Sequence, residues 1–182
     1  VKDTTANKTY WIDARGVSAK TINLITTGLL ATQQTWLYSI VGSSVNVANV
    51  SGLYASIMVA QAILESGWGS SMLASVNHNL FGIKANGSQY ANGTVTYQTG
   101  EYINGSESTI SGTFNNYASA EYSFLDYANT MNKAKYANVS RSVAGSYQQA
   151  AQNLSDDGYA TDPEYADHLI SIIQQYDLQS LD

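Results

Sequence analysis

The sequence predicts a mainly α-helical domain with a small β-hairpin lobe, an α+β arrangement. Apolar residues recur at helical spacing before residue 66 and again after residue 119. Between these two parts, residues 94–114 are rich in β-branched and aromatic side chains. The chain has 182 residues, 44% of them hydrophobic, and a single Pro. We therefore expect one domain over residues 16–182, preceded by a loose polar segment at residues 1–15.

The first helical part is expected between Ser18 and Val41, as one or two helices with a break near Gly28. Residues 42–52 are expected to form a connection, either without regular structure or with a short helix. Ser51 is a suitable N-cap for the next helix, because its hydroxyl can accept from a free backbone N–H. Apolar residues of that helix form a single stripe, and Glu65 lies at the margin of the stripe: Leu53, Ile57, Ala60 and Leu64.

The β-lobe is expected at about residues 83–114. Asn104-Gly105 is a hairpin-turn signal between its two strands. Ser119 is expected to cap the helix that follows, and a second helix is expected over residues 143–154. Pro163 is expected at the first position of the last helix, whose apolar stripe contains Tyr165, Leu169, Ile172 and Tyr176.

Composition excludes several classes of function. The net charge is −6 with only eight Lys and Arg, which does not suit a nucleic-acid partner. The sequence contains no run of about 18 apolar residues, so no membrane span is predicted. The chain has no Cys, and its two histidines lack metal-ligand neighbours, so we expect neither a metal nor a cofactor. Abundant Tyr, Ser, Thr and Asn fit a surface that binds a neutral sugar polymer, although an ordinary acidic surface of a secreted protein has the same composition.

Glu65 is the strongest candidate for chemistry. It stands where a helix is expected to end, after an apolar run and close to Trp68. Unpaired carbonyls at a helix C-terminus and removal of water both favour the protonated form of a carboxyl group. Such a group can act as a general acid near neutral pH. Glu101 lies in the β-rich segment, and on pattern alone a solvated strand position is its more common explanation.

Five motifs in order resemble the peptidoglycan N-acetylglucosaminidases of glycoside hydrolase family 73: AQAILESGWG, NLFGIK, TGEYING, FNNYAS and GYATDPEYA. The resemblance implies a lysozyme-like domain with a substrate groove beside the β-lobe. It identifies Glu65 as the acid and Glu101 as the second carboxylate, acting as base or stabiliser. It places Tyr159 near the catalytic centre, to stabilise the transition state or position the substrate acetamido group.

The same motifs imply substrate-binding positions at Trp68, Asn79, Phe81 and Tyr117, although Trp68 and Phe81 fit equally well as packing residues. Two positions depart from the family pattern. Asn115 stands where relatives often have a basic residue, and His78 where they have a small or amide residue. Neither touches the proposed acid, but both bear on substrate preference.

The resemblance implies hydrolysis of the β-1,4 bond from N-acetylglucosamine to N-acetylmuramic acid by an endo-β-N-acetylglucosaminidase. The alternatives are a muramidase or lytic transglycosylase on a similar fold, or a cell-wall binding module without turnover. The expected partner is the peptidoglycan glycan strand, and the expected location is extracellular, at the cell wall, in a secreted or phage-borne protein. We expect a monomeric catalytic domain, which can be joined to cell-wall binding domains in a longer protein.

Overall fold

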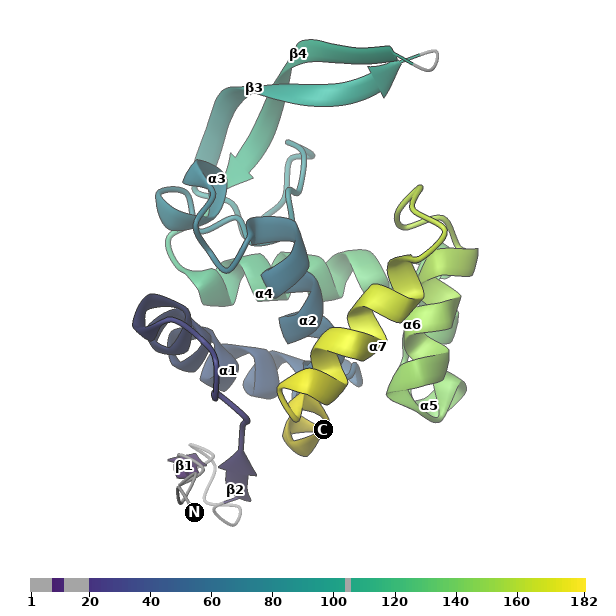
Figure 1. Ribbon diagram of the computed structural model, residues 1–182. Coiled ribbons are helices and arrows are strands. Elements are labelled where there is room, and N and C mark those ends of the chain that lie inside the picture. The colour runs from purple at the N-terminus through teal and green to yellow at the C-terminus, as the bar shows by residue number, and fades with distance from the viewer. Residues whose placement is uncertain (1–7, 12–19, 104–105) are drawn as a thin grey trace.

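The computed structural model describes residues 8–11, 20–103 and 106–182. Most of these residues form a body of helices, from which one long hairpin projects (Figure 1). The helices are α1 Ala31–Ser51, α2 Ala55–Ser66, α3 Met72–Ser75, α4 Ala120–Met131, α5 Arg141–Ala144, α6 Tyr147–Asp156 and α7 Tyr165–Gln175, with 3-10 turns at Ala134–Val139 and Leu178–Leu181. The hairpin is formed by β3 Gly93–Ile103 and β4 Ser106–Asn116. The predicted α+β class with a hairpin lobe is confirmed.

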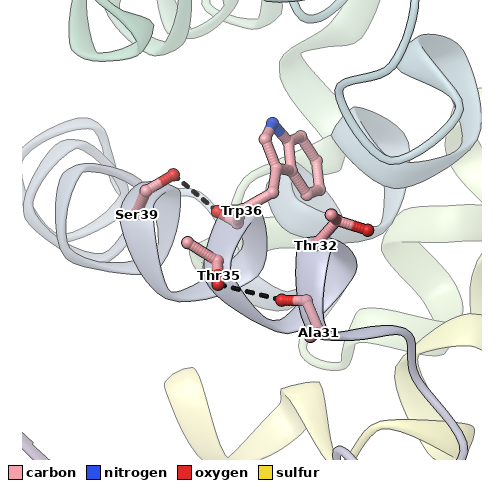
Figure 2. Close-up of a pocket in the computed structure, with 5 residues that line it drawn as sticks. All are labelled: Ala31, Thr32, Thr35, Trp36 and Ser39. Atoms are coloured by element: carbon pink, nitrogen blue, oxygen red, sulfur yellow. Dashed lines mark hydrogen bonds between the residues drawn. The ribbon is translucent and has the colours of Figure 1, made fainter.

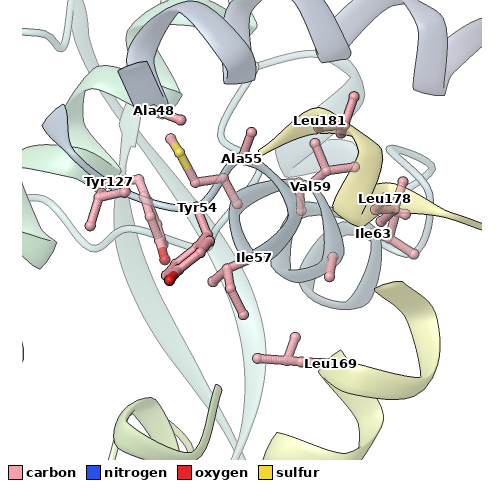
Figure 3. Close-up of a cluster of buried hydrophobic side chains, with 14 of the residues drawn as sticks. Ala48, Tyr54, Ala55, Ile57, Val59, Ile63, Tyr127, Leu169, Leu178 and Leu181 are labelled. Carbon is pink, nitrogen blue, oxygen red and sulfur yellow. The ribbon is translucent and has the colours of Figure 1, made fainter. Parts of the chain in front are cut away.

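The centre of the helical body is α2. All its residues from Ala55 to Ile63 are buried, and Figure 3 shows apolar side chains from α1, α4, α7 and the C-terminal 3-10 turn around it. The expectation of one apolar stripe is wrong here, since small and apolar residues cover every side of the helix. Leu64, expected in the stripe, is 39% exposed. The helix therefore leaves the core only in its last turn, at Leu64 and Glu65.

The N-terminal part differs most from the prediction. No helix precedes Gly28 in the described residues: β2 Lys20–Asn23 pairs antiparallel with β1 Lys8–Trp11. The strand β1 also falls within the segment expected to be loose, whereas residues 1–7 and 12–15 lie outside the described part. Helix α1 then continues through the residues expected to form a connection. One side of the helix is buried in this part, at Val41, Ser44, Val47 and Ala48.

Ser51 does not cap α2. It is the last residue of α1, where its hydroxyl donates to the carbonyl of Val47 at 2.7 Å. The N-cap of α2 is Tyr54. The predicted cap of a later helix is correct, since Ser119 is the N-cap of α4. At the start of α3, Ser71 accepts from the Ala74 N–H. None of the helices in the described part of the chain is both long and apolar enough to cross a membrane.

The hairpin pairs without interruption from Gly93↔Asn116 to Ile103↔Ser106. The predicted turn at residues 104–105 lies outside the described residues. Residues 83–92, expected in the β-lobe, contain only a single bridge, Lys84↔Phe114. Polar side chains join the base of the hairpin to the preceding loop: Tyr97 Oη donates to Asn77 Oδ1 at 2.8 Å, and Asn77 Nδ2 donates to Asn116 Oδ1 at 2.9 Å.

The C-terminal helices follow the prediction with two changes. The helix expected over residues 143–154 is divided into α5 and α6 by Gly145, whose φ of 73° ends α5. The last helix begins at Tyr165 rather than at Pro163, with Glu164 as its N-cap. Its buried residues include Tyr165 and Leu169, as expected, and then Ile173 in place of Ile172.

Candidate active site

Glu65 lies in the last turn of α2, which ends because Gly67 adopts a left-handed conformation with φ of 56°. The Glu65 residue is exposed on one side, whereas its carboxyl faces protein on the other. Burial raises the pKa of this carboxyl above its ordinary value, and a hydrogen bond from Tyr165 acts in the opposite direction. The direction agrees with the sequence-based expectation of a carboxyl that retains its proton.

A series of buried, hydrogen-bonded side chains ends at Glu65. The hydroxyl of Tyr165 donates to Glu65 Oε1 at 2.9 Å, and Gln61 Nε2 donates to the same hydroxyl at 2.8 Å. The hydroxyl of Tyr127 donates in turn to Gln61 Oε1. Gln61, Tyr127 and Tyr165 come from α2, α4 and α7, so three helices hold one carboxyl group.

Tyr159 also lies in this cluster. Its ring stacks on Tyr165 with 5.7 Å between centroids, and the edge of Tyr136 meets it at 5.9 Å. Burial raises the pKa of Tyr159, and the negative charge of Glu65 raises it further. The structure therefore brings together two of the three predicted catalytic residues, Glu65 and Tyr159.

Glu101 lies in β3, where it pairs with Ser108. The pairs Tyr102↔Glu107 and Ile103↔Ser106 separate it from the end of the described hairpin. Its side chain is outside the described part of the structure. The role of Glu101 as the second carboxylate stays a prediction.

Trp68 packs against other aromatic rings, with centroids 6.2 Å from Trp36 and 5.1 Å from Tyr176, both edge to face. It has a positive φ of 60°, and the next residue, Gly69, has a φ of 71°. A Cβ on Gly69 would lie 1.9 Å from Trp36 Nε1, so only glycine fits beneath this indole. These contacts favour the packing role that the sequence left open for Trp68.

The other three predicted substrate-binding residues lie in the interior. Phe81 is 6% exposed and packs on Phe124 and Tyr127. Asn79 donates to the carbonyls of Ile83 at 2.9 Å and Asn115 at 2.8 Å, so it fastens the loop to the hairpin. A direct sugar contact from these side chains stays a prediction, and the contacts described favour a structural role for both.

Tyr117 belongs to the same supporting layer. Its hydroxyl donates to Asp126 Oδ2 at 2.7 Å, and Asn115 Nδ2 donates to the same oxygen at 3.1 Å. Burial is the main cause that raises the pKa of Tyr117. Asn115, the departure from the family pattern, is therefore a buried partner of Asp126 at the base of the hairpin. His78, the second departure, has its Nδ1 3.1 Å from the carbonyl oxygen of Tyr117.

A shallow hollow of about 400 Å³ lies along α1 (Figure 2). Its lining contains Thr35 and Ser39, whose hydroxyls donate to the carbonyls of Ala31 at 2.9 Å and Trp36 at 2.6 Å. These hydroxyls are already used by the helix itself, and no titratable group lines the hollow. It therefore lacks the chemistry found at Glu65.

Within the described residues, no group of three His, Cys, Asp or Glu side chains is placed to hold a metal ion. His168 instead lies at the start of α7, with Nδ1 3.2 Å from Asp162 Oδ2. Sequence reasoning missed Gln61, Tyr127 and Tyr165 as parts of the site. Gln61 had one usable signal, since it precedes Glu65 by four residues and therefore lies on the same side of the helix.

The sequence matches one family model and is similar to several known proteins. The family model described as mannosyl-glycoprotein endo-beta-N-acetylglucosaminidase matches residues 42–178. The exo-glucosaminidase LytG of Bacillus subtilis is 40% identical over 156 residues, which cover 82% of this chain and 54% of LytG. A probable N-acetylmuramidase of Lactococcus lactis is 42% identical over 156 residues, 82% of this chain and 35% of that protein. The chain thus spans only about a third to a half of these relatives.

A solved structure agrees with this similarity. The catalytic domain of the autolysin Auto from Listeria monocytogenes superposes with a TM-score of 0.76 at 34% identity. The match covers 86% of this chain and 90% of the autolysin domain. The two domains therefore share one fold over nearly their whole length.

Proposed function

Because this chain belongs to the glucosaminidase family, we propose that it hydrolyses the β-1,4 bond between N-acetylglucosamine and N-acetylmuramic acid in bacterial peptidoglycan. It is a glycoside hydrolase domain with a lysozyme-like fold. The observation that carries the proposal is Glu65, a carboxyl with a raised pKa that is held by Tyr165 and open to solvent on one side.

In this mechanism, Glu65 gives its proton to the glycosidic oxygen as the bond breaks. Glu101, carried by the hairpin, acts as base or stabilises the positive charge that develops on the sugar. Tyr159 lies within the electrostatic range of Glu65, where a phenol can position the acetamido group of the substrate. Burial keeps this phenol protonated near neutral pH, so it acts as a hydrogen-bond donor rather than as a base.

The partner in this proposal is the glycan strand of the cell wall. Catalysis takes place outside the cell membrane, by a secreted or phage-borne protein. We also propose that the domain works as a monomer. In a longer protein, cell-wall binding domains would hold it close to its substrate.

One experiment tests the acid. Glu65→Gln keeps the shape of the side chain but removes its acidic proton, so sugar release from purified cell walls should fall about 10²- to 10⁴-fold. Glu121→Gln is the matched control, because Glu121 is exposed in the first turn of α4. It should leave the rate unchanged, and both variants should keep the thermal transition of the parent. Normal turnover by Glu65→Gln would reject the assignment.

A second measurement identifies the bond. After digestion and borohydride reduction, an N-acetylglucosaminidase leaves N-acetylglucosaminitol, whereas a muramidase leaves muramitol and a lytic transglycosylase leaves anhydro ends. The muramidase outcome has specific support from the name of the Lactococcus lactis relatives. The size of early fragments separates endo cleavage, which we expect, from the exo cleavage named for LytG. Binding to cell walls without release of any sugar would indicate a module without turnover.

A further inference from the structure

Three hydrogen bonds connect Tyr127 through Gln61 and Tyr165 to Glu65, and each one donates in the direction of Glu65. We propose that Gln61 and Tyr127 are positioning residues, which act through Tyr165 to fix the carboxyl oxygen that accepts a hydrogen bond and the one that carries the acid proton. The inference rests on the proposed role of Glu65 as the acid. It assigns a task to two buried residues that do not touch the substrate.

The direction follows from the number of protons available. A phenol has one O–H, and the amide nitrogen of Gln is only a donor. Because Gln61 Nε2 donates to the hydroxyl oxygen of Tyr165 at 2.8 Å, the single proton of Tyr165 is directed to Glu65 Oε1, 2.9 Å away. The amide of Gln61 is itself oriented, since the hydroxyl of Tyr127 donates to its Oε1.

Burial removes the alternatives to this arrangement. Gln61 is fully buried, Tyr127 is 2% exposed and Tyr165 is 3% exposed. A reversed amide would turn its N–H toward Tyr127 and remove the oxygen that accepts the hydroxyl proton of Tyr127, which would leave that proton unpaired in the interior. The hydrogen-bonded series from Tyr127 through Gln61 and Tyr165 to Glu65 therefore uses every donor only when it runs toward Glu65.

The groups that face Glu65 keep this direction over a wide pH range. They are Tyr165 of α7, Tyr159 of the preceding loop and Tyr127 of α4. Burial raises the pKa of all three phenols, and the charge of Glu65 raises each one further. None of them loses its proton near neutral pH, so each remains a donor.

The consequence concerns the two oxygens of Glu65. Oε1 is occupied by the hydrogen bond from Tyr165, which leaves the acid proton on Oε2. The same bond favours the carboxylate and so opposes the effect of burial. The orientation of an amide one helical turn away thus limits how high the pKa of Glu65 rises, and with it the upper pH limit of activity.

The test is a carbon-13 NMR titration of the side-chain carboxyls. The chain has only five glutamates, and Glu65→Gln identifies the signal of interest. Tyr127→Phe removes only the hydroxyl that orients Gln61, and Gln61→Met removes the amide. In both variants the titration midpoint of Glu65 should move to higher pH by about 0.5 to 1. The upper limb of the kcat/KM profile should move in the same direction.

Tyr117→Phe is the control, because it removes an equally buried hydroxyl that donates to Asp126 instead. It should leave the Glu65 midpoint unchanged. An unchanged midpoint in folded Tyr127→Phe would overturn the inference, even if Tyr165→Phe moved it. The titration does not need turnover, so it separates two failures. A moved midpoint with an active Glu65→Gln enzyme rejects only the proposed acid, whereas an unmoved midpoint with an inactive one rejects only the positioning role.

Discussion

Glu65 and Glu101 are carried by two regions of opposite construction. Glu65 ends a helix that is buried from Ala55 to Ile63 and is held by side chains from two other helices. Glu101 belongs to a hairpin of two strands that form a sheet of their own and extend away from the helices, with one further bridge from Lys84 to Phe114 (Figure 1). The hydrogen bonds described between this hairpin and the preceding loop, such as Tyr97 to Asn77, lie at its base.

The difference concerns how each region obtains its order. Packing in the core orders the helical region. The conformational entropy lost there is part of the entropy lost when the whole domain folds. A two-stranded hairpin is marginally stable by itself, so the outer part of β3 and β4 depends on the attachment at its base. The helical side therefore provides rigidity, whereas the hairpin is a separable unit. Three predictions test this division, beginning with the largest effect.

Shortening the hairpin should abolish activity without loss of the fold. Replacing residues 98–111 by Asn-Gly retains the pairs from Gly93↔Asn116 to Tyr97↔Gly112 and removes Glu101. If Glu101 is the second carboxylate, sugar release should fall at least about 10²-fold. The thermal transition should change little, because the helical core is untouched. Glu101→Gln in the full-length hairpin should lower sugar release by a similar factor. An active short variant would show that the hairpin does not contribute to catalysis.

Asn79→Ala should reduce stability by about 2 to 4 kcal/mol. The side chain of Asn79 is 1% exposed, donates to two carbonyls and accepts from the N–H of Ile83, and all three partners would lose a bond. Urea unfolding measures the change. Asn92→Ala is the matched control, since Asn92 is exposed and accepts one bond from Asn116. Its loss should stay below about 1 kcal/mol, and equal losses would mean that the base of the hairpin is not held from the interior.

The smallest effect concerns pH. Because the pKa of Glu65 is raised in the folded state, the folded protein binds more protons than the unfolded chain. The stabilising contribution of this group is complete below its unfolded pKa and is lost as the pH rises through its folded pKa. Glu65→Gln does not titrate, so its melting temperature relative to the parent should increase between pH 4 and pH 8. A difference that decreases over this range would mean that the pKa is not raised.

The sequence was sufficient for the local features of the site. The positions of Glu65 near a helix end, Ser119 at a helix start and the two strands of the hairpin all depend on neighbouring residues. Tertiary contacts decided the rest. Residues 42–51 contain Gly, Ser and Asn, which are weak helix formers, but burial of Val47 and Ala48 keeps them helical.

The contact that holds Glu65 could not be predicted from local pattern. Tyr165 appeared to be one more apolar residue of the last helix, and it lies 100 residues from Glu65 in the chain. Its hydroxyl comes within hydrogen-bond distance of Glu65 only when α2 and α7 are packed together. The same holds for Gln61 and Tyr127, which are 66 residues apart and meet in the core.

The turn after Glu65 has a consequence for how such sequences are interpreted. Gly67, Trp68 and Gly69 all have positive φ, and Gly69 lies directly beneath the Trp36 indole. These residues are restricted by backbone geometry and by close packing rather than by reaction chemistry. A chain that had lost its acid during evolution would still need glycine at position 69 in order to pack beneath the indole. In a genome survey, the Gly-Trp-Gly sequence therefore indicates this turn, whereas the residue two positions before it and the carboxylate proposed on the hairpin distinguish an enzyme from an inactive copy.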